Sequence, residues 1–267
     1  DAQVQAEYTE LFRADSIIAD AEAVREVLLA DRADKRWSTI GQSFGGFLTL
    51  SYLSFAPQSL RDCRITAGLA PIRTSVDNVY QHTFDRMKER VEEYYSWFPE
   101  DAELATRIAE HLRTHKEYLP TGERLTDHRF QMAGHFLGGR WRERGLHYFL
   151  ETAFAEGNDH LSDQFLTAMG AEVTFQANPL YALMHETIYA DGPADGVLPG
   201  IPGYELSPSP APTNWSAARV AASRPEFAPD ADRLLFTGEH IFPWYYEEDP
   251  SLRPLAEVAN LLAEKKD

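Results

Sequence analysis

Residues 41–45 read Gly-Gln-Ser-Phe-Gly, a spacing that can present a serine as a nucleophile. In a Gly-x-Ser-x-Gly turn between a buried strand and a helix, the serine takes a strained positive φ that exposes its hydroxyl oxygen. We expect Ser43 to be the attacking group and the backbone N–H of Phe44 to donate a hydrogen bond to the oxyanion that forms. A side chain at Gly41 or Gly45 would collide with the neighbouring strand or helix, so both positions require glycine.

The residues on either side of this motif have the composition expected of a strand before it and a helix after it. Residues 37–40 (Trp-Ser-Thr-Ile) predict a short buried strand, and residues 46–50 (Gly-Phe-Leu-Thr-Leu) predict the start of a helix. A second strand is predicted over 64–69, and apolar residues spaced between Ile17 and Leu28 predict a helix before the first strand. A strand, helix and strand in this order imply a parallel sheet with flanking helices. This context favours a nucleophile turn over a chance match in a glycine-rich loop.

Beyond residue 75 the apolar residues follow a helical period. Helices are predicted over 76–94, 104–112, 141–154, 162–169 and 255–262, with a Pro- and Gly-rich loop over 191–212 and a short strand over 233–236. The order of these elements predicts an α/β fold class, and the arrangement resembles part of an α/β-hydrolase core with a large helical cap. We assign residues 1–74 to the core, which carries the motif, and residues 75–267 to the mainly helical cap domain.

The composition describes a globular chain with an acidic surface. Its 267 residues are 43% hydrophobic and 12% aromatic, enough to bury a sizeable core. The net charge of -17 repels nucleic acids and anionic membranes, so we expect neither as a partner, whereas a cationic ligand suits this surface. The single cysteine, Cys63, excludes an internal disulfide, and neither a signal peptide nor a membrane-spanning run is visible. We expect a cytoplasmic location, and the oligomeric state stays open.

Two further segments accompany the motif and its surroundings at residues 40–47. Residues 184–189 read Met-His-Glu-Thr-Ile-Tyr, and residues 236–244 read Phe-Thr-Gly-Glu-His-Ile-Phe-Pro-Trp. With these segments, nearly the whole chain resembles the larger bacterial proline iminopeptidases, also called prolyl aminopeptidases. These serine peptidases of the α/β-hydrolase superfamily remove an N-terminal proline from peptides. The resemblance implies an acyl-enzyme on Ser43, and we expect no cofactor.

An exopeptidase must recognise the free, positively charged terminal nitrogen of its substrate, and acidic side chains are suited to this. The resemblance implies that Glu186 and Glu239 bind this amine. Either glutamate can instead be ordinary solvated surface, since Glu186 lies on a helix-like stretch and Glu239 in an acidic neighbourhood. Aromatic residues that could surround the proline ring, and that could equally be core residues, are Phe136, Trp141, Tyr189 and Trp244.

A serine nucleophile needs a histidine base and an acid, which in this fold follow the serine in the order acid, then histidine. In the family both follow late core strands, and an upstream His-Gly-Gly-Pro-Gly loop supplies a second oxyanion donor. Because no such segments appear, the chain resembles a fragment truncated at both ends, and we expect the triad acid and histidine outside it. In the alternative, Asp191 or Asp195 followed by His240 keeps the required order within the chain.

Two other interpretations stay open beside a serine aminopeptidase. Another capped hydrolase, such as an esterase, would share the motif but not the amine-binding glutamates. A non-catalytic polypeptide would keep the fold only for binding, which the missing acid and histidine favour. A metal site is not expected, because His111 and His115 lack the glutamate that follows the first histidine of zinc peptidases. We expect these two histidines on an exposed helix face.

Overall fold

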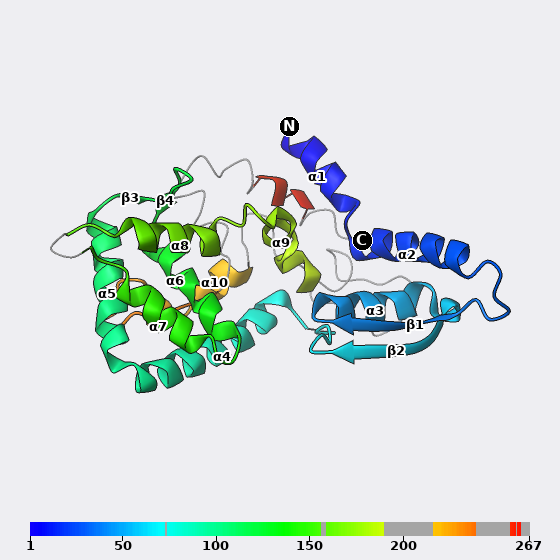
Figure 1. The fold of residues 1–267 in the computed structure, drawn as a ribbon, viewed down its shortest axis with the longest axis horizontal. Helices are drawn as coiled ribbons and strands as arrows, with labels where there is room; N and C mark the ends of the chain where they lie inside the picture. Colours follow the sequence, from blue (N-terminus) through cyan, green and yellow to red (C-terminus); the bar gives the residue numbers. More distant parts are fainter. Residues whose placement is uncertain (73, 156–158, 190–215, 239–256, 260, 263–267) are drawn as a thin grey trace. The chain divides into compact units, whose positions relative to one another are not determined.

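The computed structural model describes residues 1–72, 74–155, 159–189, 216–238, 257–259 and 261–262, which divide into two compact units (Figure 1). The first unit contains Asp1–Ser75 together with 184–189 and 261–262. The second contains Val76–Leu183 together with 216–238 and 257–259. Residues 184–189, which the sequence placed in the cap domain, thus group with the N-terminal residues.

The first unit contains the predicted strand, helix and strand. Its elements are α1 (Ala2–Glu10), α2 (Ala14–Leu28), β1 (Trp37–Gln42), α3 (Phe44–Phe55), η1 (Pro57–Ser59), β2 (Leu60–Thr66) and η3 (Glu186–Tyr189). The strands β1 and β2 are parallel, with Gly41 paired to Ile65 and Gln42 to Thr66. Parallel neighbours require a crossover connection, and α3 provides it. The expected parallel arrangement is confirmed for these two strands, while a complete α/β-hydrolase core stays a prediction.

The helices of the first unit pack in layers on this small sheet. Helix α3 contacts both strands, and α2 packs against α3 (Figure 1). The buried residues Ile18, Tyr52, Ala56 and Leu60 form the core between these elements. Some predicted apolar positions are outside this core, because Ile40 is 78% exposed and Leu28 66% exposed.

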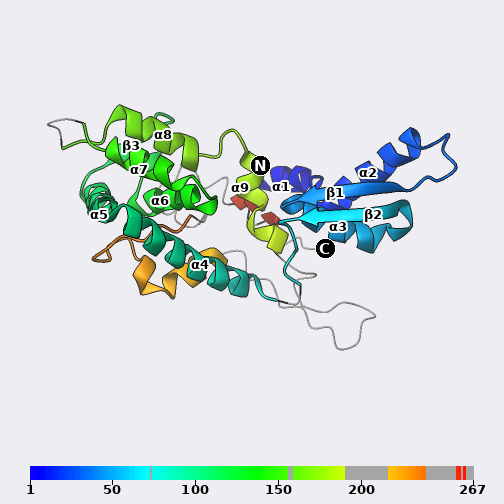
Figure 2. The same cartoon turned by 60° about the horizontal axis from the view of Figure 1, so that its bottom comes forward.

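The second unit is mainly helical, as predicted (Figure 2). Its helices are α4 (Val76–Trp97), α5 (Pro99–Thr114), α6 (Asp127–Gln131), η2 (Met132–Gly138), α7 (Glu143–Glu151), α8 (Asp163–Val173), α9 (Pro179–Met184, whose last residue belongs to the first unit), α10 (Ser216–Ala222) and η4 (Pro225–Phe227). Two short antiparallel strands, β3 (Glu117–Tyr118) and β4 (Arg124–Leu125), pair with each other. Helix α5 begins with proline and carries Glu100 and Asp101 in its first turn, which suits the positive end of the helix dipole. Among the helices that the structure describes, none combines the length and apolarity needed to cross a bilayer.

The predicted strand over 233–236 is wrong. Residues 234–236 are buried without strand structure, and side chains replace the hydrogen bonds of a ladder. Tyr95 Oη donates to the Leu234 carbonyl oxygen (2.8 Å), and Gln131 Nε2 donates to the Leu235 carbonyl oxygen (2.8 Å). The Leu234 N–H donates to Thr106 Oγ1 (3.1 Å). Short apolar runs are ambiguous in sequence, because burial in a loop requires the same residues as a buried strand.

Candidate active site

The turn between β1 and α3 has the backbone geometry that exposes a serine. Ser43 has φ 55° and ψ −124°, and the residue is exposed. Its N–H donates to the Thr66 carbonyl oxygen of β2 (3.1 Å), and its own carbonyl oxygen accepts from the Gly46 N–H (2.8 Å). A positive φ at a residue other than glycine is strained and persists only where neighbouring contacts hold it. The turn therefore has the conformation predicted for a nucleophile, and the catalytic role of Ser43 stays a prediction.

Close packing explains one glycine of the motif and one beside it. A Cβ atom at Gly41 would overlap the Gly45 carbonyl oxygen, and one at Gly46 would overlap the Gly68 carbonyl oxygen. A Cβ atom at Gly45, in contrast, would meet no described atom within 4 Å, so the predicted collision at Gly45 is wrong. The close approach of Gly46 and Gly68 brings the first turn of α3 against the chain that leaves β2.

The start of α3 supplies the electrostatic part of the site. The first four N–H groups of an α-helix have no partner within the helix and carry the positive end of its dipole. Phe44 is the first residue of α3 and follows Ser43 directly. A negative charge that develops beside Ser43 would therefore be stabilised by this helix end.

Glu186 is buried, at 9% exposure, in the short helix η3 of the same unit. Aromatic contacts join η3 to α3, because the Tyr189 and Phe47 rings meet edge to face with centroids 6.2 Å apart. The ring of Phe47 also lies 6.2 Å from that of Phe44, the residue after Ser43. The alternative that Glu186 is exposed surface is therefore wrong. A buried carboxylate on the short helix that carries Tyr189 suits the recognition of a cation.

Several predicted site residues are not placed by the structure. Glu239, Asp191, Asp195, His240 and Trp244 lie outside the described residues. In the part of the chain that is described, the Ser43 hydroxyl has no hydrogen-bond partner, so no triad base is identified there.

The remaining aromatic candidates lie in the second unit. Phe136 is half-buried and stacks on Phe149 with centroids 5.5 Å apart. Trp141 is 92% exposed, so the alternative that it belongs to the core is wrong. Its backbone φ of 76° is one of the positive values found at residues other than glycine.

A hydrogen-bond network around Glu22, which joins the elements on either side of the turn, was not recognised from sequence. The Glu22 carboxylate on α2 accepts hydrogen bonds from Arg25 (2.8 and 2.9 Å), from Ser59 Oγ (2.7 Å) and from Tyr52 Oη. Tyr52 in turn accepts from the Trp37 indole N–H of β1 (3.0 Å). The Arg25 hydrogen bond leads the effects that lower the pKa of Glu22 to about 2, while burial and this carboxylate raise the pKa of Tyr52 to about 12. One carboxylate thus ties α2, α3 and the sheet together.

The two histidines four residues apart on α5 are only partly as expected. His115 is exposed, but His111 is buried, so an exposed face for both is wrong. Their rings stack with centroids 4.3 Å apart, and His111 Nε2 lies 2.6 Å from Glu117 Oε1. The contacts of His111 with the Glu117 carboxylate and with the His115 ring give His111 a structural role.

Comparison with curated proteins confirms the resemblance that the motifs predicted. A protein of Aeromonas sobria named proline iminopeptidase is 40% identical over 264 residues, which are 98% of this chain and 57% of that protein. The proline iminopeptidase aneH of Aspergillus aculeatus is 33% identical over 275 aligned residues, which are 100% of this chain and 56% of that protein. The chain therefore spans slightly more than half the length of these relatives. No protein-family model matches it.

Proposed function

We propose that this chain, which is related to the proline iminopeptidases over its whole length, carries the nucleophile and the amine-binding carboxylate of a serine aminopeptidase. The substrate is a peptide with a free N-terminal proline. The observation that carries the proposal is the strained, exposed Ser43 at the start of α3, in a chain with this relationship. The relationship supports the reaction class, and the geometry of the turn supports Ser43 Oγ as the attacking atom.

In the proposed reaction, Ser43 Oγ attacks the carbonyl carbon of the N-terminal proline residue and loses its proton to a base. The tetrahedral oxyanion lies at the start of α3, where the Phe44 N–H donates to it. When the intermediate collapses, the C–N bond to the next residue breaks, and the departing amine takes up a proton. Water then hydrolyses the proline ester of Ser43, which releases proline and restores the hydroxyl.

Glu186 gives this reaction its selectivity for a free terminus. The carboxylate is buried on η3, which contacts the first turns of α3 through Tyr189 and Phe47. The secondary amine of an N-terminal proline is a cation at neutral pH, and a carboxylate with little competing water binds a cation strongly. Glu239 is proposed as a second carboxylate for the same amine. The edge-to-face rings of Tyr189 and Phe47 supply an apolar surface for the pyrrolidine ring.

Hydrolysis of a prolyl arylamide by the full-length protein, compared with hydrolysis of the N-acetylated form, tests the proposal. We expect hydrolysis of the free form only, and a loss of at least about 1,000-fold in kcat for Ser43→Ala. Glu186→Gln should lower kcat/KM for the free form by about tenfold to a hundredfold, because a charge-assisted hydrogen bond is lost. The control Glu26→Gln removes a charge at a side chain that is 74% exposed and should leave kcat/KM unchanged.

Equal hydrolysis of the free and acetylated substrates would contradict the aminopeptidase proposal and favour an esterase-like hydrolase. An unchanged kcat in Ser43→Ala would contradict the nucleophile itself. An unchanged kcat/KM in Glu186→Gln would remove Glu186 from amine recognition while leaving the nucleophile in place.

A further inference from the structure

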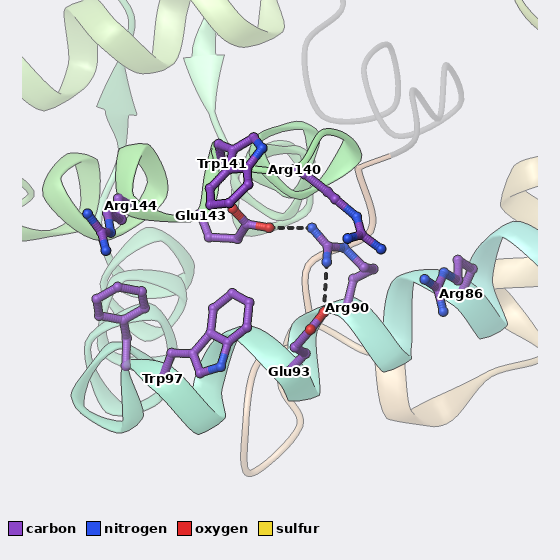
Figure 3. Close-up of a pocket in the computed structure, with 9 residues that line it drawn as sticks. Arg86, Arg90, Glu93, Trp97, Arg140, Trp141, Glu143 and Arg144 are labelled. Carbon is purple, nitrogen blue, oxygen red and sulfur yellow. Dashed lines mark hydrogen bonds and ion pairs between the residues drawn. The ribbon is translucent and has the colours of Figure 1, made fainter. Parts of the chain in front are cut away.

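A pocket of about 580 Å³ in the second unit combines arginine and tryptophan side chains (Figure 3). Its volume is that of a small-molecule site. Helix α4 contributes Arg86, Arg90, Glu93 and Trp97, whose spacing places them along one face of the helix, and the turn before α7 and the start of α7 contribute Arg140, Trp141, Glu143 and Arg144. Nothing in the proposed peptidase reaction uses these residues.

The charges of the pocket favour an anion. Both of its glutamates are occupied by Arg90, which lies 2.7 Å from Glu93 and 2.5 Å from Glu143. Arg140 and Arg144 have no acidic partner among the described residues, although the chain as a whole carries a net charge of -17. Two unpaired guanidinium groups beside the start of a helix add to the positive end of its dipole. The pocket is therefore a positive site on an acidic protein.

The aromatic side chains of the pocket favour a planar ligand. Figure 3 shows the rings of Trp97 and Trp141 reaching into the pocket from α4 and from the turn before α7. Trp97 is 53% exposed and Trp141 92% exposed, so both rings are accessible to a ligand. Aromatic rings attract one another in offset stacks, and guanidinium groups stack on aromatic faces.

Buried contacts hold this arrangement in place. Glu143 is 7% exposed, and its carboxylate accepts a hydrogen bond from Arg90 (2.5 Å). Burial opposes ionisation of Glu143, but nearby backbone N–H groups and Arg90 outweigh burial and hold the pKa of Glu143 below its ordinary value. The Glu143 carboxylate thus joins the start of α7 to the arginine on α4, two residues after the strained turn at Trp141, whose φ is 76°.

We propose that this pocket is a binding site for a planar aromatic carboxylate. The ligand ring lies against Trp97 and Trp141, and its carboxylate accepts hydrogen bonds from Arg140 and Arg144. Arginine is suited to this because its planar group can donate two parallel hydrogen bonds to a carboxylate. The proposal does not depend on the proposed function, since it uses only residues of the second unit.

Isothermal titration calorimetry with 2-naphthoate tests the site. We expect saturable binding of one 2-naphthoate per chain, and binding at least about tenfold weaker for the neutral 2-naphthamide and for the non-planar cyclohexanecarboxylate. The double variant Arg140→Gln/Arg144→Gln should weaken 2-naphthoate binding by about tenfold or more, and Trp141→Ala by about fivefold. These side chains are exposed, so both variants should fold as the unmodified protein does, which circular dichroism checks.

Two control variants distinguish 2-naphthoate binding in this pocket from binding elsewhere on the protein. Arg107→Gln removes an exposed arginine of α5 that does not line the pocket, and Ser43→Ala changes the candidate active site. Both should bind 2-naphthoate within about twofold of the unmodified protein. The proposal is overturned by absent or non-saturable binding, by equal affinity for 2-naphthoate and either comparison ligand, or by unchanged affinity in the Arg140→Gln/Arg144→Gln variant.

Discussion

Replacing Glu22 by glutamine should destabilise the first unit by about 3 kcal/mol at pH 7. The Glu22 carboxylate accepts hydrogen bonds from Arg25, Tyr52 and Ser59, and the Arg25 contact leads the effects that lower its pKa from the ordinary 4.5 to about 2. At about 1.4 kcal/mol for each pH unit between these two values, the folded state gains about 3 kcal/mol from the ionised form.

The sign of the pH dependence follows from the lowered pKa of Glu22. A carboxyl group that ionises more readily in the folded state stabilises it fully above the pKa of the unfolded chain, about 4.5. This contribution is lost as the pH falls from about 4.5 through about 2, and roughly 1.4 kcal/mol is left at pH 3. The difference between the unmodified protein and Glu22→Gln should therefore shrink by about half or more between pH 7 and pH 3.

Urea unfolding at both pH values, followed by circular dichroism and tryptophan fluorescence, measures this difference. Glu26→Gln is the control, because Glu26 is a 74% exposed neighbour 3.9 Å from Arg25 and should change stability by less than about 0.5 kcal/mol. Equal stability of Glu22→Gln and the unmodified protein at pH 7 would refute the reasoning. An equally large difference at pH 3 would refute the assignment of the effect to ionisation.

Substitutions at three other positions test the packing. Gly46→Ala should destabilise the protein by about 2 kcal/mol and reduce reaction at Ser43, because the added Cβ would overlap the Gly68 carbonyl oxygen. Gly45→Ala, with no described atom within 4 Å of the new methyl group, should be tolerated in both assays, and equal effects of the two changes would contradict the packing described here. Gln131→Ala should cost about 2 to 3 kcal/mol in urea unfolding, since Gln131 is fully buried and donates to the Phe227 and Leu235 carbonyl oxygens. A decrease of less than about 0.5 kcal/mol in the free energy of unfolding would show that water replaces the Gln131 side-chain amide as the hydrogen-bond donor.

The turn around Ser43 was the part of the site most accessible from sequence. Its residues are consecutive, and strand, glycine and helix signals all act over a few positions. Only part of the glycine packing was predicted from sequence. The close contact at Gly41 was predicted, whereas the contact of Gly46 with Gly68, 22 residues further along the chain, was not, and Gly45 meets no described atom within 4 Å. Such contacts between distant segments are set by packing, which a local pattern does not contain.

The burial of single polar and aromatic residues was less accessible from sequence. Glu186 is buried through the position of η3, whereas Trp141 is exposed on the turn before α7. Residues 234–236 have the composition of a strand, yet side chains of α4, α5 and α6 accept or donate their backbone hydrogen bonds. In each case the deciding partner lies on another element, so residue type alone did not distinguish the alternatives.

The central claim is that Ser43 is the nucleophile, and covalent labelling tests it most directly. The purified full-length protein is treated with a fluorophosphonate, and the modified residue is identified by peptide mass spectrometry. We predict one label per chain, located on Ser43 and absent in Ser43→Ala, with loss of prolyl arylamide hydrolysis in proportion to labelling. Labelling of a different serine that abolishes hydrolysis, or full hydrolysis by the Ser43→Ala variant, would contradict the claim.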